Sequence, residues 1–273
     1  MKQYVVFSDL DGTLLDYHTY SFEKALPALR LLNERNVPLV ICSSKTRSEI
    51  ERYREKLANR HPFISENGGG IFIPKGYFDF SLKDISDEII EENSYTVVRL
   101  GAGYPDLREA LKTLRSEGFQ VRGFGDMTVG EVSVLAGMTF QEAEMAKARE
   151  FDEPFTFSGD EAEIHRLFDG IRKLGFTYTQ GRFFHVLGNS DKGKAVSILT
   201  SLYKRKFGET TTVALGDNLN DRPMLKRVDV PVLVQKQDGK YSQGIDISNL
   251  MRADGIGPEG WNKEVLRLLS TQW

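Results

Sequence analysis

Two aspartates, Asp9 and Asp11, stand one residue apart directly after the apolar run YVVF. In an extended backbone, residues i and i+2 project to the same side, so both carboxylates can face one small volume. Two close carboxylates repel each other unless a cation or a shared proton lies between them. The pair therefore predicts a divalent-cation site, although an isolated pair of this kind could equally be a helix cap or an Asx-turn before Gly12.

A second acidic group, Asp217 and Asp221, follows the strand-like run TTVALG with a spacing of four residues. If a helix begins there, both carboxylates share one face. Either residue alone could instead belong to a turn or cap a helix. Two acidic groups at the carboxyl ends of strands are harder to explain by capping, because open parallel sheets bind ligands at that edge. Together they predict a site of hard oxygen ligands, with Mg²⁺ as the expected ion.

Three further polar residues could bind an anion beside these carboxylates. Ser43 and Ser44 follow the strand-like run VPLVIC and could donate hydrogen bonds to an anionic oxygen. A serine before a helix is more often an N-cap, however. Lys192, in SDKGKAV, could place a positive charge beside a phosphoryl group, whereas a lysine at a helix start is usually solvated surface.

The segments that would position these residues alternate between apolar runs of strand length and helical patterns, which predicts an α/β fold with parallel strands. Strands are expected over residues 4–8, 37–42, 62–66, 211–217 and 230–235. Helices are expected over residues 22–35, 46–57 and 192–207.

The middle of the chain follows a different pattern. Helices are expected over residues 104–117, 139–150 and 160–174, among strands over 96–100, 119–124, 153–158, 176–180 and 183–188. The last two strands, joined by QGR, predict an antiparallel hairpin. We therefore expect a Rossmann-like parallel-sheet core domain from residues 1–83 and 188–273, with an αβ cap domain inserted at 84–187.

The composition excludes several classes of protein. The 273 residues carry a net charge of −3 without a basic stripe, which argues against nucleic-acid binding. The single cysteine excludes an internal disulfide framework, and no apolar run approaches the roughly 20 residues of a membrane helix. With no signal peptide visible, these features predict a soluble, cytoplasmic protein with no membrane partner. The sequence leaves the oligomeric state open.

Four segments in this order, DLDGT, SS, Lys192 and GDNLND, resemble the haloacid dehalogenase-like phosphatase superfamily. The inserted module resembles the larger αβ cap of its Cof-type branch. The resemblance implies an aspartyl-phosphate mechanism, in which Asp9 attacks phosphorus and Asp11 acts as general acid and then as base. Ser43 would bind the phosphate, with Ser44 as the alternative.

The resemblance also implies the ligands of the Mg²⁺ ion. A carboxylate oxygen of Asp9, the backbone carbonyl of Asp11, and Asp217 would bind it. Asp221 would bind directly or through water, or would orient its neighbours.

A narrower resemblance is to the mannosyl-3-phosphoglycerate phosphatase family, through ICSSKTRSEIE, ISENGGGIFIP, REFDEPF, QGRFFHVLG and GPEGW. It implies Mg²⁺-dependent hydrolysis of mannosyl-3-phosphoglycerate, a small phosphorylated sugar-glycerate, to the compatible solute mannosylglycerate. Families acting on glucosyl-3-phosphoglycerate or sucrose phosphate share this scaffold, so a related phosphosugar hydrolase is the alternative. A mutase is a further variant. A phosphometabolite-binding module on an inactive scaffold is the non-enzyme alternative, and the presence of both aspartates argues against it.

The same resemblance implies five substrate-binding residues besides the serines. Asn67 and Gly68, in the ENGGG turn, would lie near the cleft. Glu153, Arg182 and His185, in the cap, would bind the glycerate carboxylate and the sugar hydroxyls, and the forked guanidinium of arginine suits a carboxylate. Arg182 could instead be a surface charge at a hairpin tip, and His185 an ordinary strand residue.

Overall fold

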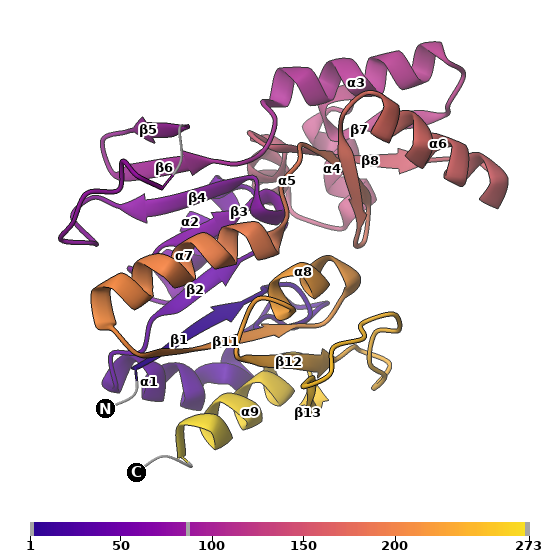
Figure 1. Ribbon diagram of the computed structural model, residues 1–273. Helices are drawn as coiled ribbons and strands as arrows, with labels where there is room; N and C mark the ends of the chain where they lie inside the picture. The colour runs from indigo at the N-terminus through magenta and orange to yellow at the C-terminus, as the bar shows by residue number, and fades with distance from the viewer. Residues whose placement is uncertain (1–2, 86–87, 271–273) are drawn as a thin grey trace.

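The computed structural model describes residues 3–85 and 88–270, and a nine-stranded sheet forms its centre, in the order β13-β12-β11-β1-β2-β3-β4-β6-β5 (Figure 1). The first six strands in this order are parallel. They are β13 (Met251–Ile256), β12 (Val230–Gln235), β11 (Thr210–Gly216), β1 (Gln3–Ser8), β2 (Leu39–Cys42) and β3 (Phe63–Ser65). The remaining three, β4 (Gly70–Pro74), β6 (Tyr95–Arg99) and β5 (Ile89–Glu91), are antiparallel. The predicted α/β fold with a parallel-sheet core is confirmed.

Helices cover both faces of this sheet, because alternate residues of its buried strands point to opposite sides. In β1, Val6 packs in the cluster that includes residues of α1 (Leu26–Glu34), α2 (Arg47–Lys56) and α9 (Pro258–Ser270). Its neighbours Val5 and Phe7 pack in the cluster on the other face, with α7 (Lys192–Phe207) and α8 (Arg222–Leu225). Because the sheet is covered on both faces, ligands can reach its strands only at their ends.

The middle of the chain forms a second, four-stranded antiparallel sheet, in the order β7-β8-β10-β9. Its strands are β7 (Val121–Gly123), β8 (Asp152–Phe157), β10 (Phe184–Leu187) and β9 (Thr177–Gln180). Its apolar cluster includes residues of α3 (Tyr104–Ser116) and α6 (Glu161–Lys173). The β9–β10 hairpin forms as predicted.

Two short helices, α4 (Val129–Ala136) and α5 (Phe140–Lys147), connect β7 with β8. The helix predicted over 139–150 ends three residues early, and α4 was not predicted. Helix α4 has eight residues and leaves Val134 85% exposed, so its apolar residues do not follow one buried stripe. A helical period is therefore hard to recognise in this segment.

The pairing of β5 and β6 bears on the start of the inserted module, which the sequence predicts at residue 84. Strands β5 and β6 fall inside the predicted insert, yet they extend the nine-stranded sheet. In β6, Val97 and Val98 pack on opposite faces of that sheet, as core strands do. The alternation of apolar residues along a segment predicts a strand, but it does not show which sheet that strand joins. We propose that the insert runs from residue 100 to residue 188 and that the described residues on either side, 3–85, 88–99 and 189–270, form the core. Within the described residues, no helix is long and apolar enough to cross a membrane.

Candidate active site

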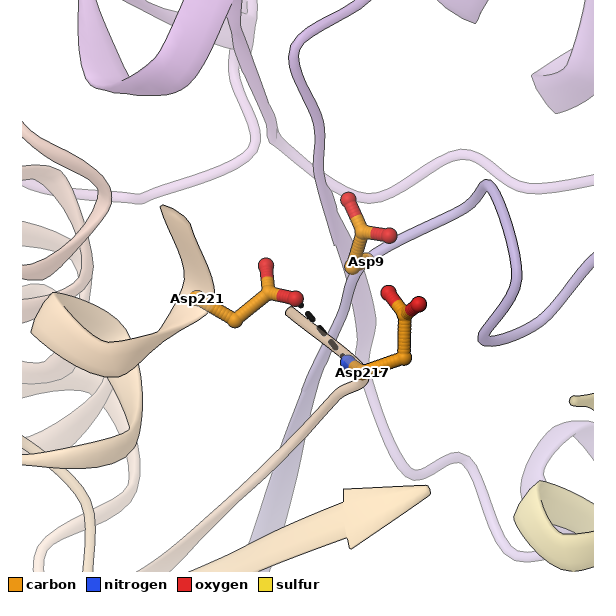
Figure 2. A group of neighbouring side chains, drawn as sticks. All are labelled: Asp9, Asp217 and Asp221. Atoms are coloured by element: carbon orange, nitrogen blue, oxygen red, sulfur yellow. Dashed lines mark hydrogen bonds between the residues drawn. The ribbon is translucent and has the colours of Figure 1, made fainter. Parts of the chain in front are cut away.

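Three buried aspartates meet at the carboxyl ends of β1 and β11 (Figure 2). Asp9 follows β1, Asp217 follows β11, and Asp221 ends the short 3₁₀ helix η4 (Leu219–Asp221). The two strands are parallel neighbours with Ser8 opposite Leu215, so their ends deliver Asp9 and Asp217 to one point. One carboxylate oxygen from each aspartate lies within 4.8 Å of the others. This brings together the two acidic groups that were recognised separately in the sequence.

Lys192, the first residue of α7, balances part of this negative charge. Its Nζ lies 2.7 Å from Asp9 Oδ1 and 2.7 Å from Asp221 Oδ1, and its side chain is fully buried. The other oxygen of Asp221 accepts hydrogen bonds from the backbone N–H groups of Asp217 (2.9 Å, dashed in Figure 2) and Asn218 (3.0 Å). Asp221 therefore shapes the loop that presents Asp217 and also orients Lys192.

The cluster holds more negative than positive charge. Burial, with a contribution from Asp221, raises the pKa of Asp9 to about 7 even though Lys192 opposes the shift. Burial, Asp221 and Asp9 likewise raise the pKa of Asp217 well above its usual value. Carboxylate oxygens at these separations are ligands that a hard divalent cation prefers, and its charge would favour their ionised forms. The carboxylate ligands and their excess negative charge therefore both fit a divalent cation such as Mg²⁺.

The side chain of Asp11 lies outside this cluster and faces a lysine instead. Its Oδ2 is 3.1 Å from Lys45 Nζ, which is also 3.4 Å from Glu49 Oε1. Asp11 is 31% exposed at its side chain, whereas Lys45 and Glu49 are 7% exposed. The arrangement separates Asp11 from the other three carboxylates and leaves it open to the pocket.

Lys45 was not predicted as a site residue. The feature of the sequence that could have identified Lys45 is its place in SSKT, immediately after the two candidate serines. It lies within cation–π distance of Tyr20, 5.0 Å from the ring centroid. Thr46 caps α2 and forms a capping box with Glu49, which fixes the backbone beside Lys45.

The two serines occupy different positions. Ser44 lines the pocket, whereas Ser43 is fully buried beside it. Ser43 Oγ accepts a hydrogen bond from the backbone N–H of Lys45 at 3.2 Å, which leaves its O–H free to donate.

A pocket lies above these carboxylates, between the core and the inserted sheet. Its walls include most of the predicted site residues: Asp9, Asp11, Ser44, Asn67, Arg182, His185 and Asp217. Other residues of both parts, including Tyr17, Tyr20, Lys45 and Arg149, complete it. Because both parts line it, the insert can select what reaches the aspartates.

Two predicted substrate residues, Gly68 and Glu153, do not line this pocket. A side chain at Gly68 would collide with the backbone of Asp191 and Lys192, and its φ is +95°. Gly68 therefore lets the turn pack against the start of α7 and has a structural role. Glu153 is fully buried in the insert, where it binds Arg108 at 2.7 Å.

The position of Glu153 follows from the alternation of β8. Pro154 lines the pocket, and Asp152 bonds with the pocket residue His185. Glu153, between them, projects to the opposite face, where its Oε1 accepts the N–H of Gly125 at 2.8 Å. Glu153 therefore points away from the pocket, whereas its neighbour Asp152 contacts the pocket residue His185.

Arg182 and His185 both face the pocket from the β9–β10 hairpin. Arg182 donates through Nη1 to the carbonyl of Ala136 at 2.7 Å, so it holds the end of α4 as well as lining the pocket. His185 is buried, and its Nδ1 lies 2.9 Å from Asp152 Oδ2.

Comparison with known proteins identifies the family. The model of the haloacid dehalogenase-like hydrolases matches residues 6–100 and 139–240. A glucosyl-3-phosphoglycerate/mannosyl-3-phosphoglycerate phosphatase of Methanococcoides burtonii is 47% identical, over 98% of this chain and 97% of its own. A mannosyl-3-phosphoglycerate phosphatase of Pyrococcus horikoshii is 39% identical, over 88% of this chain and 94% of its own.

Solved structures agree on the fold. The crystal structure of Thermoplasma acidophilum 0175 has a TM-score of 0.70 at 16% identity and covers 98% of this chain and 99% of its own. The sucrose-phosphatase of Synechocystis has a TM-score of 0.62 at 14% identity, with 98% of each chain covered. The similarity to named phosphatases supports the predicted enzyme over a binding module on an inactive scaffold. Sequence, fold and relatives agree that this chain belongs to the haloacid dehalogenase-like hydrolases.

Proposed function

We propose that this chain is a Mg²⁺-dependent phosphatase that hydrolyses mannosyl-3-phosphoglycerate to mannosylglycerate and phosphate. The observation that supports it most is the buried cluster of Asp9, Asp217, Asp221 and Lys192 beneath a pocket shared by core and insert. The glucosyl ester is a second candidate substrate, because the relative that is 47% identical is named for both sugars.

In the proposed mechanism Asp9 attacks phosphorus and forms an aspartyl phosphate, while the bond from phosphorus to the glycerate oxygen breaks. Asp11 gives its proton to that departing oxygen. It then takes a proton from a water molecule, which attacks the aspartyl phosphate and releases phosphate and the Asp9 carboxylate. Lys192 holds the Asp9 carboxylate in place through its 2.7 Å contact.

Asp9, Asp217 and the backbone carbonyl of Asp11 would hold the Mg²⁺ ion, with Asp221 binding or orienting them. The ion supplies positive charge beside the transferring phosphoryl group. Ser43 and Ser44 are the proposed hydroxyl donors to the phosphoryl oxygens.

The insert is the proposed specificity module. Arg182 donates through Nη1 to the carbonyl of Ala136 at 2.7 Å and through Nη2 to that of Leu135 at 3.5 Å, and its remaining N–H groups suit the glycerate carboxylate. His185, in the insert, and Asn67, in the core, both line the pocket and are the proposed partners of other polar groups of the substrate.

The direct test is phosphate release in the presence of Mg²⁺ from mannosyl-3-phosphoglycerate, glucosyl-3-phosphoglycerate, sucrose 6-phosphate and mannose 6-phosphate. We expect the two phosphoglycerate esters to be hydrolysed with kcat/KM at least about 100-fold above the other two, because only they offer a carboxylate to Arg182. Equal values for all four would contradict the proposed substrate class. Transfer of phosphate to another hydroxyl, without release, would indicate a mutase.

Replacing Lys45 by methionine is expected to lower kcat about 100-fold, because Asp11 loses the cation that holds its carboxylate in place. The replacement Lys45→Arg keeps a cation and is expected to retain more activity. Lys24→Met is the matched control, since Lys24 forms an exposed ion pair with Glu259. The measurement is steady-state kinetics, with urea unfolding to verify the fold. An unchanged kcat in Lys45→Met would show that Asp11 does not depend on this contact.

A further inference from the structure

A chain of hydrogen bonds runs from the loop after β11 to the insert along the wall of the pocket. Asn220 Nδ2 donates to Asn67 Oδ1 at 3.2 Å, and Asn67 Nδ2 donates to Asp152 Oδ2 at 3.0 Å. The same oxygen of Asp152 lies 2.9 Å from His185 Nδ1. The chain connects the loop that presents the metal-site carboxylates with a residue of the insert that lines the pocket.

The core holds Asp152 through its backbone as well as its side chain. Glu66 Oε2 accepts the backbone N–H groups of Phe151 and Asp152, each at 2.8 Å. The second carboxylate oxygen of Asp152 accepts from Arg149 Nη1 at 3.0 Å. Asp152 is fully buried, and both its oxygens are engaged. Its position is therefore set by two adjacent core residues, Glu66 and Asn67.

Those two residues have an unusual backbone conformation. Glu66 and Asn67 have φ values of +47° and +55°, in the left-handed region, which non-glycine residues seldom occupy. The backbone N–H of Glu66 donates to Lys45 O, and that of Asn67 to Ser43 O, each at 3.0 Å. Such strain persists where the surroundings over-determine it, and here it turns both side chains toward Asp152.

The donors and acceptors in the chain have only one consistent arrangement. Burial opposes the ionisation of Asp152, but His185 and Arg149 outweigh it and lower its pKa. An ionised carboxylate only accepts, so the NH₂ group of Asn67 must face it and Nδ1 of His185 must carry a proton. This leaves Nε2 as the ring nitrogen available to a ligand in the pocket.

We propose that Asp152 and Asn67 are positioning residues for substrate binding. Asp152 fixes the orientation of the His185 ring, so that Nε2 is available to the bound ester. Asn67 holds the Asp152 carboxylate in place relative to the loop after β11, through its hydrogen bonds to Asp152 and Asn220. The identity of the ester rests on the proposed function, whereas the arrangement of the ring does not.

A double-mutant cycle tests whether Asp152 acts through His185. We expect Asp152→Asn to raise KM for mannosyl-3-phosphoglycerate about 10-fold, with kcat changed less than about threefold. In the His185→Ala background the same replacement is expected to change KM by less than about twofold. The same factor in both backgrounds would show a purely structural role and overturn the proposal.

Asp126→Asn is the matched control for the integrity of the insert. Asp126 is also a carboxylate of the insert paired with arginines, Arg108 and Arg115, but it does not line the pocket. We expect its KM to stay within about twofold of wild type. A KM raised as much as in Asp152→Asn would overturn the specific role of Asp152.

The role of Asn67 is tested by replacing its donor. Asn67→Asp places a second acceptor against Asp152 and is expected to raise KM more than Asn67→Ala does. Equal effects of the two replacements would contradict the assigned orientation of the amide.

A measurement without substrate separates this inference from the proposed function. Long-range ¹H–¹⁵N correlation spectra report the protonated nitrogen of each of the four histidines, and His185→Gln assigns the signal. We expect protonation at Nδ1 in wild type and in Asp126→Asn, and its loss in Asp152→Asn. A neutral ring protonated at Nε2 in wild type would overturn the inference. Absence of turnover of any phosphoglycerate ester would refute the proposed function and leave this test valid.

Discussion

The Asp9→Asn variant is expected to release no measurable phosphate, with a loss on the order of 10⁴-fold or more, because an amide cannot form the aspartyl phosphate. Its fold should persist, since Lys192 keeps its 2.7 Å contact with Asp221. The measurement is phosphate release with Mg²⁺ from mannosyl-3-phosphoglycerate, together with binding of the ester to the inactive variant.

The same variant has an expected effect on stability without metal. Burial raises the pKa of Asp9 in the folded protein to about 7, from 3.8. Between these values the folded state binds more protons than the unfolded state, so the contribution of Asp9 to stability is lost as pH rises from about 4 to 7. Asp9→Asn should therefore reduce the loss of folding stability as pH rises over this range. The check is urea unfolding in EDTA across that pH range, and an unchanged pH dependence would contradict it.

The second large effect is expected from Lys192→Met, which removes the cation between two buried carboxylates. Breaking a buried ion pair costs about 3–5 kcal/mol, because the partner charges remain without compensation. Lys192 bonds with Asp9 and Asp221 and is fully buried, so we expect a loss of this size in the free energy of unfolding, measured by urea unfolding in EDTA.

Mg²⁺ is expected to restore part of that loss, because a cation bound only by the folded protein stabilises it by mass action. Lys194→Met is the matched control: Lys194 lies two residues further along α7, is exposed, and bonds with Asn189. It should change stability by less than about 0.5 kcal/mol. Equal losses in the two variants, or no response of Lys192→Met to Mg²⁺, would contradict the proposed charge balance of the cluster.

Local sequence determined the parts of the site that each follow one strand. Asp9 and Asp11 after β1, and Asp217 and Asp221 after β11, were identified because an apolar run predicts a buried strand whose carboxyl end faces ligands. Lys192 was found through the order of the four family segments. Helices α2, α3, α6 and α7 were placed within a residue of their ends. The helix expected over 22–35 begins later, at Leu26, after a short 3₁₀ helix over Glu23–Ala25.

The sequence could not determine which face of a strand meets the pocket, or which distant segments contact each other. Glu153 was predicted to bind substrate although its side chain points away from the pocket, because periodicity shows that neighbours in β8 point to opposite sides, but not which side meets the pocket. The residues of β5 and β6 were assigned to the insert because the sequence does not show that β6 pairs with β4 and β5 with β6, which extends the core sheet.

The contact of Lys45 with Asp11 and the chain from Asn67 to His185 join residues that are far apart in sequence. Local sequence therefore predicted the groups that we propose to react, because they follow the carboxyl ends of buried strands. Only the tertiary structure decided which residues hold those groups in place, because such contacts form when segments distant in sequence pack together, within the core or between core and insert.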